Sequence, residues 1–163
     1  MSPAAPLSRE LFLTVVEHTP LVSVDLICRD EQDRILLGLR NNRPAQGSWF
    51  VPGGRIAKDE RVADALQRVV ARELGLALEV ATARPLGVFQ HLYADNFADA
   101  PGISTHYVVL AYEIRIGAAS ALAIDPQHSE LRWFSLAELL ASAQVHDYTK
   151  AYFDPSIRTT CVP

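Results

Sequence analysis

Cysteine is scarce in this sequence, since Cys28 and Cys161 are the only two among 163 residues. They lie far apart and form no CxxC pair, so both are predicted to be free thiols, without a disulfide framework or a cysteine-based metal site. No apolar run reaches the length of a membrane-spanning helix, and the first residues, MSPAAPLSRELF, lack the charged-then-apolar pattern of a secretion signal. We therefore expect a protein of the reducing cytoplasm that does not bind a membrane.

Positive charge is also limited. Lysine and arginine number 15 against 19 acidic residues, which gives a net charge of −4. General nucleic-acid and membrane-surface binders need a basic face, so we exclude both classes. An anionic ligand would have to be held by individual arginines or by a metal ion. The chain is long enough for one sizeable core and short for two, so residues 1–163 are expected to form a single domain.

Strand-like and helix-like segments are mixed without a regular β–α alternation. Strands are expected at residues 21–28, 34–39, 78–92, 105–116 and 131–134, and helices at residues 8–18, 58–74, 135–142 and 146–153. The first two strands flank a polar turn and should form a hairpin, while residues 41–58 have the proline and glycine content of a loop. We predict an α+β fold, in which helices pack on the faces of a mixed β-sheet.

The stretch RVVARELGL, residues 68–76, places a lone glutamate in an apolar helix face. At about 100° per residue, Glu73 falls within the stripe formed by Val62, Ala65, Leu66, Val69 and Val70. A buried carboxylate without a partner costs several kcal/mol. Either the stripe ends before Glu73 and water reaches it, or a cation lies beside it.

The spacing around this helix resembles the signature of the Nudix hydrolases. That signature is glycine, five residues, glutamate, seven residues, and then Arg-Glu-apolar-x-Glu-Glu-x-Gly-apolar. It is matched here by Gly54, Glu60, Arg68, Val70, Glu73, Gly75 and Leu76. The resemblance implies the Nudix fold and a site for a divalent metal and a diphosphate. An amphipathic helix ended by a glycine is the plainer alternative.

Two positions depart from the signature, because Val69 and Arg72 stand where the family has glutamates. In the usual members this acidic cluster binds several metal ions that activate water for attack on phosphorus. With one carboxylate left, the helix can offer a site for one metal ion, and Arg72 would repel a second. Glu73 is therefore interpreted as the surviving metal ligand, and attack on phosphorus is disfavoured.

Longer strings extend the resemblance from about Phe12 to Phe153. They are HTPLVSVDLI, GLRNNRPAQGSWFVPGGR, GVFQHLYADNF, THYVVLAY and DPQHSELRWF. Together they resemble one branch of the family, the GDP-mannose mannosyl hydrolases. The branch implies cleavage of GDP-mannose to GDP and mannose by attack of water on the anomeric carbon, with one Mg²⁺ per active site (Mn²⁺ is an alternative), in a homodimer. Inversion is expected because water attacks once and no paired carboxylates suggest a covalent intermediate.

The resemblance also implies a base and a set of metal ligands. His128, expected on a loop before the strand at 131–134, is the candidate general base, since an imidazole titrates near neutral pH. A solvated loop histidine is the alternative. The implied metal ligands are the carbonyl of Gly53, the carboxylate of Glu73 and the amide oxygen of Gln127.

Three arginines, Arg40, Arg55 and Arg68, are assigned by resemblance to the diphosphate and to catalysis through the leaving group. Arg68 could equally form a structural ion pair with Glu60, and Arg43 is interpreted as a surface or turn residue.

The sugar is assigned to Asp25 and His91, and the phosphate side also to Tyr107. The alternatives are that Asp25 is a strand-end aspartate facing water, that His91 is a core histidine, and that Tyr107 is an aromatic packed in its strand.

Three functions therefore compete. The first is Mg²⁺-dependent glycosyl hydrolysis of GDP-mannose. The second is a pyrophosphatase that yields GMP and mannose 1-phosphate, which the residues at positions 69 and 72 disfavour. The third is a nucleotide-sugar sensor without catalysis, which the presence of Glu73, Gln127 and His128 together disfavours because a binder needs no base.

Overall fold

The structure, a computed structural model, describes residues 6–77, 79–117, 122, 126–157 and 161–162. Its elements in chain order are α1 (Arg9–His18), β1 (Leu21–Arg29), β2 (Ile35–Arg40), β3 (Trp49–Phe50), β4 (Gly53–Arg55), α2 (Val62–Leu74), the 3-10 turn η1 (Val80–Thr82), β5 (Arg84–Tyr93), β6 (Thr105–Arg115), β7 (His128–Phe134), α3 (Leu136–Ala141), α4 (Asp147–Lys150) and β8 (Cys161–Val162). None of the described helices is long and apolar enough to span a bilayer.

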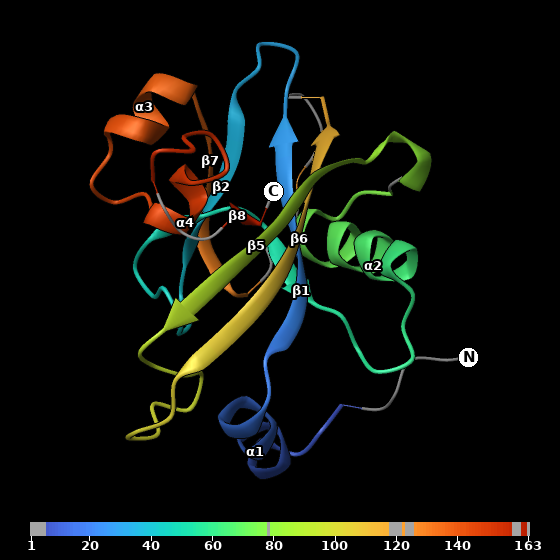
Figure 1. Cartoon of the computed structure of the whole chain (residues 1–163). Helices are drawn as coiled ribbons and strands as arrows, with labels where there is room; N and C mark the ends of the chain where they lie inside the picture. Colours follow the sequence, from blue (N-terminus) through green and yellow to red (C-terminus); the bar gives the residue numbers. More distant parts are fainter. Residues whose placement is uncertain (1–5, 78, 118–121, 123–125, 158–160, 163) are drawn as a thin grey trace.

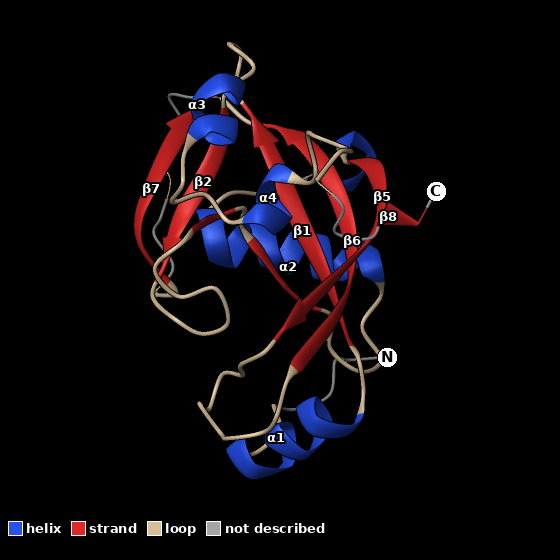
Figure 2. Cartoon of the chain, turned by 60° about the vertical axis from the view of Figure 1, so that its left-hand side comes forward, coloured by secondary structure: helices blue, strands red, loops and turns tan. Residues whose placement is uncertain are grey.

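The strands form one mixed sheet with the order β3-β2-β1-β6-β5-β8, to which β4 adds on β1 and β7 on β2. Strands β1 and β6 run parallel over the whole length of β1, whereas β5 pairs with β6 antiparallel. The predicted hairpin of β1 and β2 is present. Helix α2 covers one face of the sheet, α3 and α4 cover the other, and α1 lies at one end (Figure 1 and Figure 2). The predicted α+β architecture is confirmed.

Each face of the sheet has its own apolar core because successive side chains of a strand point to opposite faces. Val24, Leu26 and Cys28 of β1 pack with the apolar stripe of α2, and Cys28 is a buried free thiol. Ile27 joins the second core, which includes Trp49, Phe50 and Leu139 near α3 and α4. Asp25 therefore lies on the side of α4. The side chain of Cys161 lies outside the described residues.

Several predicted boundaries are wrong. The strand expected from residue 78 starts at Arg84, because residues 80–82 form a 3-10 turn in which the Thr82 hydroxyl donates to the Glu79 carbonyl at 2.7 Å. The helix expected from residue 58 starts at Val62, since the Glu60 carboxylate accepts from the Ala57 amide at 2.8 Å and stabilises a preceding turn. The expected loop 41–58 contains the short strands β3 and β4.

Candidate active site

Glu73 is buried, with its residue 1% exposed, so the apolar stripe of α2 does continue to this carboxylate. Its Oε1 accepts from Nε and Nη2 of Arg72 at 3.1 and 2.7 Å. The Gln127 amide donates to the same oxygen at 3.0 Å, and Nδ1 of His128 lies 3.4 Å from Oε2. Of the two alternatives from sequence, a cation beside the carboxylate is therefore the correct one, and that cation is Arg72.

The donor set around Glu73 fits a hard divalent cation. Glu73 and Gln127, two predicted ligands from distant parts of the chain, are in direct contact, and rotation of the Gln127 amide presents an oxygen there. The third predicted ligand, Gly53, is followed by Gly54. A Cβ added to Gly54 would lie 3.0 Å from Nη2 of Arg72, so the two glycines border the cluster around Glu73. Among the described residues, no group of three or more His, Cys, Asp or Glu side chains is arranged to hold a metal ion. An ion would therefore depend on one carboxylate and on neutral oxygens.

His128 is the first residue of β7 and pairs with Arg40 at a register shift in the β2–β7 ladder. The prediction of a loop residue is wrong, because this ladder extends three residues beyond the expected strand. His128 is only 4% exposed. Its ring lies against Gly38 of β2, where a Cβ would clash with Cδ2 and lie 2.7 Å from Cγ. The structure thus places the imidazole in a fixed position between Glu73 and Gly38.

Gly38→Ala tests this placement. The added methyl group must displace the imidazole, so for the reaction that the resemblance implies kcat is expected to fall by about 10-fold or more while GDP binding stays within about 3-fold. Steady-state kinetics and calorimetric titration with GDP measure the two quantities. Gly47→Ala is the control, since a Cβ there meets nothing within 4 Å, although its φ of +78° predicts some loss of stability. Unchanged turnover in Gly38→Ala would mean that the position of the ring does not matter.

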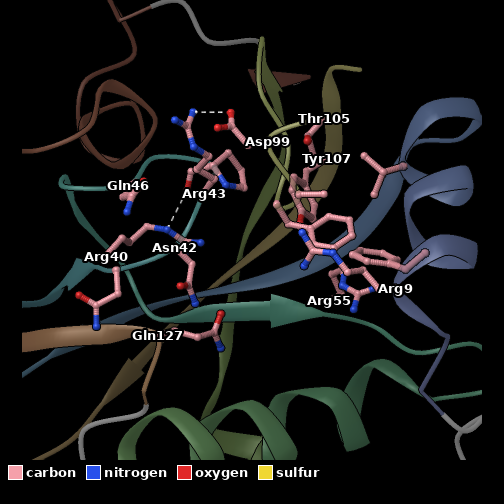
Figure 3. A pocket seen from close by; sticks show the side chains of 16 residues that line it. Arg9, Arg40, Asn42, Arg43, Gln46, Arg55, Asp99, Thr105, Tyr107 and Gln127 are labelled. Carbon is pink, nitrogen blue, oxygen red and sulfur yellow. Dashed lines mark hydrogen bonds and ion pairs between the residues drawn. The ribbon is translucent and has the colours of Figure 1, made fainter. Parts of the chain in front are cut away.

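Four arginines converge on one open cavity of about 570 Å³, although the chain is acidic. They are Arg9, Arg40, Arg43 and Arg55, and Tyr107 and Gln127 also line the cavity (Figure 3). Arg40, Arg55 and Tyr107 were predicted to contact the diphosphate, and the structure brings these three together with Gln127, a predicted metal ligand. A cavity of this volume is typical of small-molecule sites.

One corner of the cavity combines cations with aromatic rings. The Arg55 guanidinium lies 3.8 Å from the centre of the Phe12 ring, and Arg9 lies 5.2 Å from that of Phe97. The two rings are 4.7 Å apart. Burial, with the neighbouring Arg72 and Arg68, lowers the pKa of Arg55. Anionic ligand atoms would relieve this crowding of positive charge.

Arg43 is an exposed residue in a bend, which agrees with its prediction as a surface or turn residue, and it also connects two loops. Its Nη1 lies 3.1 Å from Asp95 and 3.4 Å from Asp99, so it joins the loop after β2 to the loop between β5 and β6. It lines the cavity at the same time.

Arg68 does not line this cavity. Its Nε and Nη2 donate to the Glu60 carboxylate at 2.6 and 2.8 Å, and Nη2 also donates to the Arg55 carbonyl at 2.7 Å. The ion pair that was the alternative reading of Arg68 is therefore present. Through the second bond Arg68 supports the backbone of a cavity arginine.

Replacing Arg68 with glutamine is expected to destabilise the fold by about 2 kcal/mol, because the Glu60 side chain, 1% exposed, loses its charged partner. Urea denaturation measures the change. A double-mutant cycle with Glu60→Gln isolates the pair, and Arg61→Gln, an exposed charge on the same helix, is the control. A coupling energy near zero would contradict the structural role.

Asp25 and His91 lie together on the α4 side of the sheet, and both are buried. Burial raises the pKa of Asp25 to about 7, opposed by a hydrogen bond from Tyr152 and by the charge of Arg40. Burial, with a smaller effect of His146, lowers the pKa of His91 to about 3, so His91 is neutral. The water-facing aspartate that was the alternative for Asp25 is wrong, and neither residue lines the cavity.

Comparison with known proteins decides the family. A model of the NUDIX domain matches residues 19–154. The chain belongs to the Nudix hydrolase family. It is 42% identical over 141 residues to the low-salt glycan biosynthesis protein Agl8 of Haloferax volcanii, with 86% of this chain and 84% of that protein covered.

Solved structures agree with this assignment. A MutT Nudix hydrolase from Burkholderia pseudomallei is 28% identical, with a TM-score of 0.67, over 88% of this chain and 99% of that one. The Nudix domain of Shewanella oneidensis NrtR, solved with ADP ribose, is 22% identical with a TM-score of 0.61, over 94% and 100%. The second likeness shows the fold alone. The predicted Nudix fold is confirmed, and Nudix enzymes generally use divalent metal ions such as Mg²⁺.

Some residues around the Nudix site were missed by sequence reasoning. Gly38 carried a signal, since a glycine inside a predicted strand marks a close approach. Arg9 and Phe97 belong to a predicted helix and a loop that meet only in the fold. Tyr152 lies in a turn just after α4 and belongs to no motif.

Proposed function

We propose that this Nudix protein hydrolyses GDP-mannose to GDP and mannose, with Mg²⁺, by attack of water on the anomeric carbon and with inversion there. The observation that carries the proposal is the reduced acidic cluster of α2. Its buried carboxylate, Glu73, has a guanidinium at 2.7 Å in place of a second acid. Such a cluster suits chemistry in which a metal ion only assists the leaving group.

Attack on carbon makes smaller demands on this site than attack on phosphorus. The bond to the glycosidic oxygen breaks as an oxocarbenium-like transition state forms, and the departing GDP gains negative charge. When bound at Glu73, Gln127 and the Gly53 carbonyl, Mg²⁺ would neutralise part of that charge. Arg40 and Arg55 offer forked donors to the diphosphate from the cavity wall. No carboxylic acid is then required to protonate the leaving group.

His128 would accept the proton of the attacking water. Its Nδ1 lies 3.4 Å from Oε2 of Glu73, so the proposed base and the proposed metal ligand are neighbours. Asp25 and His91 would recognise the hexose, and the guanine would lie in the cavity that Phe12 and Phe97 line. The name of the relative Agl8 is consistent with a substrate from glycan synthesis. The resemblance to mannosyl hydrolases supports a homodimer in the cytoplasm as part of the proposal.

Product analysis tests the proposed reaction. The enzyme with Mg²⁺ and GDP-mannose is expected to give GDP and mannose by chromatography, with β-mannose as the first anomer detected by proton NMR. GMP with mannose 1-phosphate would instead support the pyrophosphatase. Calorimetric binding of GDP-mannose without products at high enzyme concentration would support the sensor.

A further inference from the structure

One hydroxyl group joins the two residues assigned to the hexose. Tyr152 lies just after α4, and its hydroxyl donates to Oδ2 of Asp25 on β1 at 2.6 Å. The same oxygen lies 3.3 Å from Nε2 of His91 on β5. Tyr152 therefore links a short segment near the C-terminal end of the chain to two strands of the central sheet.

The directions of these bonds follow from the available protons. A phenol has one proton, and its contact with Asp25 has the length of a charge-assisted bond. His91 is neutral, and its contact with the phenol oxygen is satisfied when Nε2 carries the proton. The chain of donors therefore runs from His91 through Tyr152 to Asp25, and it fixes both the ring tautomer and the carboxylate.

The bond from Tyr152 also determines which carboxylate oxygen is left to recognise a ligand. Oδ2 is occupied by the phenol, while Oδ1 faces the paired strand β4, where a Cβ on Gly53 would lie only 2.5 Å away. Gly53 has no side chain, so Oδ1 borders the glycine turn next to the Glu73 cluster. Under the proposed function, Oδ1 is the carboxylate oxygen left to accept from a hydroxyl of the hexose.

We propose that Tyr152 is a positioning residue that orients Asp25 and His91 and thereby sets which hexose of a nucleoside diphosphate sugar is accepted. This inference rests on the proposed function for its substrate class. A merely structural Tyr152 would contribute only its ring, which packs edge-on against Phe89 with centroids 4.7 Å apart. Removing the hydroxyl alone separates the two roles.

The test is Tyr152→Phe, with Tyr112→Phe as the matched control. Tyr112 lies on the opposite face of the sheet, with the core that contacts α2. At pH 8 and saturating Mg²⁺, kcat/KM for GDP-mannose is expected to fall about 10- to 30-fold in Tyr152→Phe, and that for GDP-glucose, the epimer at C2, by less than about 3-fold. The inhibition constant of GDP should not change in either variant. An unchanged ratio of the two sugars would overturn the inference.

Binding measurements keep this result separate from the proposed reaction. The affinity of GDP-mannose relative to GDP, measured by calorimetry, reports the contribution of the sugar even without turnover. It should be largely lost in Tyr152→Phe and kept in Tyr112→Phe. If the wild type bound GDP-mannose without hydrolysing it, the proposed reaction would fail while the role of Tyr152 could still be measured. If the sugar contribution were equal in wild type and Tyr152→Phe, the inference would fail alone.

Discussion

Replacing His128 with glutamine is expected to lower kcat by about 10²–10⁴-fold with little change in substrate binding. Glutamine retains a polar side chain but cannot accept the proton of water at neutral pH. The imidazole lies between Gly38 and the Glu73 carboxylate, and His128 is only 4% exposed. Another side chain therefore has little room to take the place of the imidazole as the base. The loss should therefore appear in the chemical step.

Steady-state kinetics with GDP-mannose and calorimetry with GDP would give kcat and the affinity separately. His106→Gln is the control, because His106 lies on β6 beside Gln90 and outside the cavity. Thermal unfolding of each variant identifies losses that come from the fold alone. Turnover near the wild-type rate in His128→Gln would remove His128 from its role as base.

Glu73→Gln is expected to weaken Mn²⁺ binding by at least about 10-fold and to lower activity in proportion, because it removes the carboxylate of the proposed metal site. Arg72→Gln should act in the opposite direction. Its guanidinium competes for Oε1 at 2.7 Å, and loss of a nearby positive charge favours a bound cation. Since the Arg72 side chain is 43% exposed, solvent screening limits the expected gain to about 3- to 10-fold.

Titration of the metal-free protein with Mn²⁺, followed by electron paramagnetic resonance, gives affinity and stoichiometry without reference to activity. Arg61→Gln removes the same charge at the exposed N-cap of α2 and serves as the control. Opposite shifts in Glu73→Gln and Arg72→Gln would support a carboxylate shared between a metal and an internal cation. Unchanged Mn²⁺ affinity in Glu73→Gln would exclude it as a ligand.

Much of the fold followed from local patterns. The period of the apolar residues predicts α2 and its stripe, and the spacing from Gly54 to Leu76 matches the signature of the Nudix helix. The same period placed Glu73 within the stripe but left open whether water reaches it, and the structure shows that the carboxylate is buried. These features depend on residues within one turn or a few turns of each other.

The remainder depends on contacts between distant segments. His128 was expected in a loop because its strand is defined by pairing with β2, almost 90 residues earlier in the chain. The phenol of Tyr152 meets Asp25 across 127 positions, and Arg43 meets Asp95 across 52. No local pattern encodes such pairs. Only the packing of α4 and the loops on the sheet reveals them.

Hydrolysis of GDP-mannose in ¹⁸O-labelled water tests the central claim, attack on carbon, most directly. Mass spectrometry of the products, taken before the free sugar exchanges its anomeric oxygen, shows where the label enters. The account predicts label in mannose and none in GDP. Label in GDP, in GMP or in mannose 1-phosphate would place the attack on phosphorus and contradict the account.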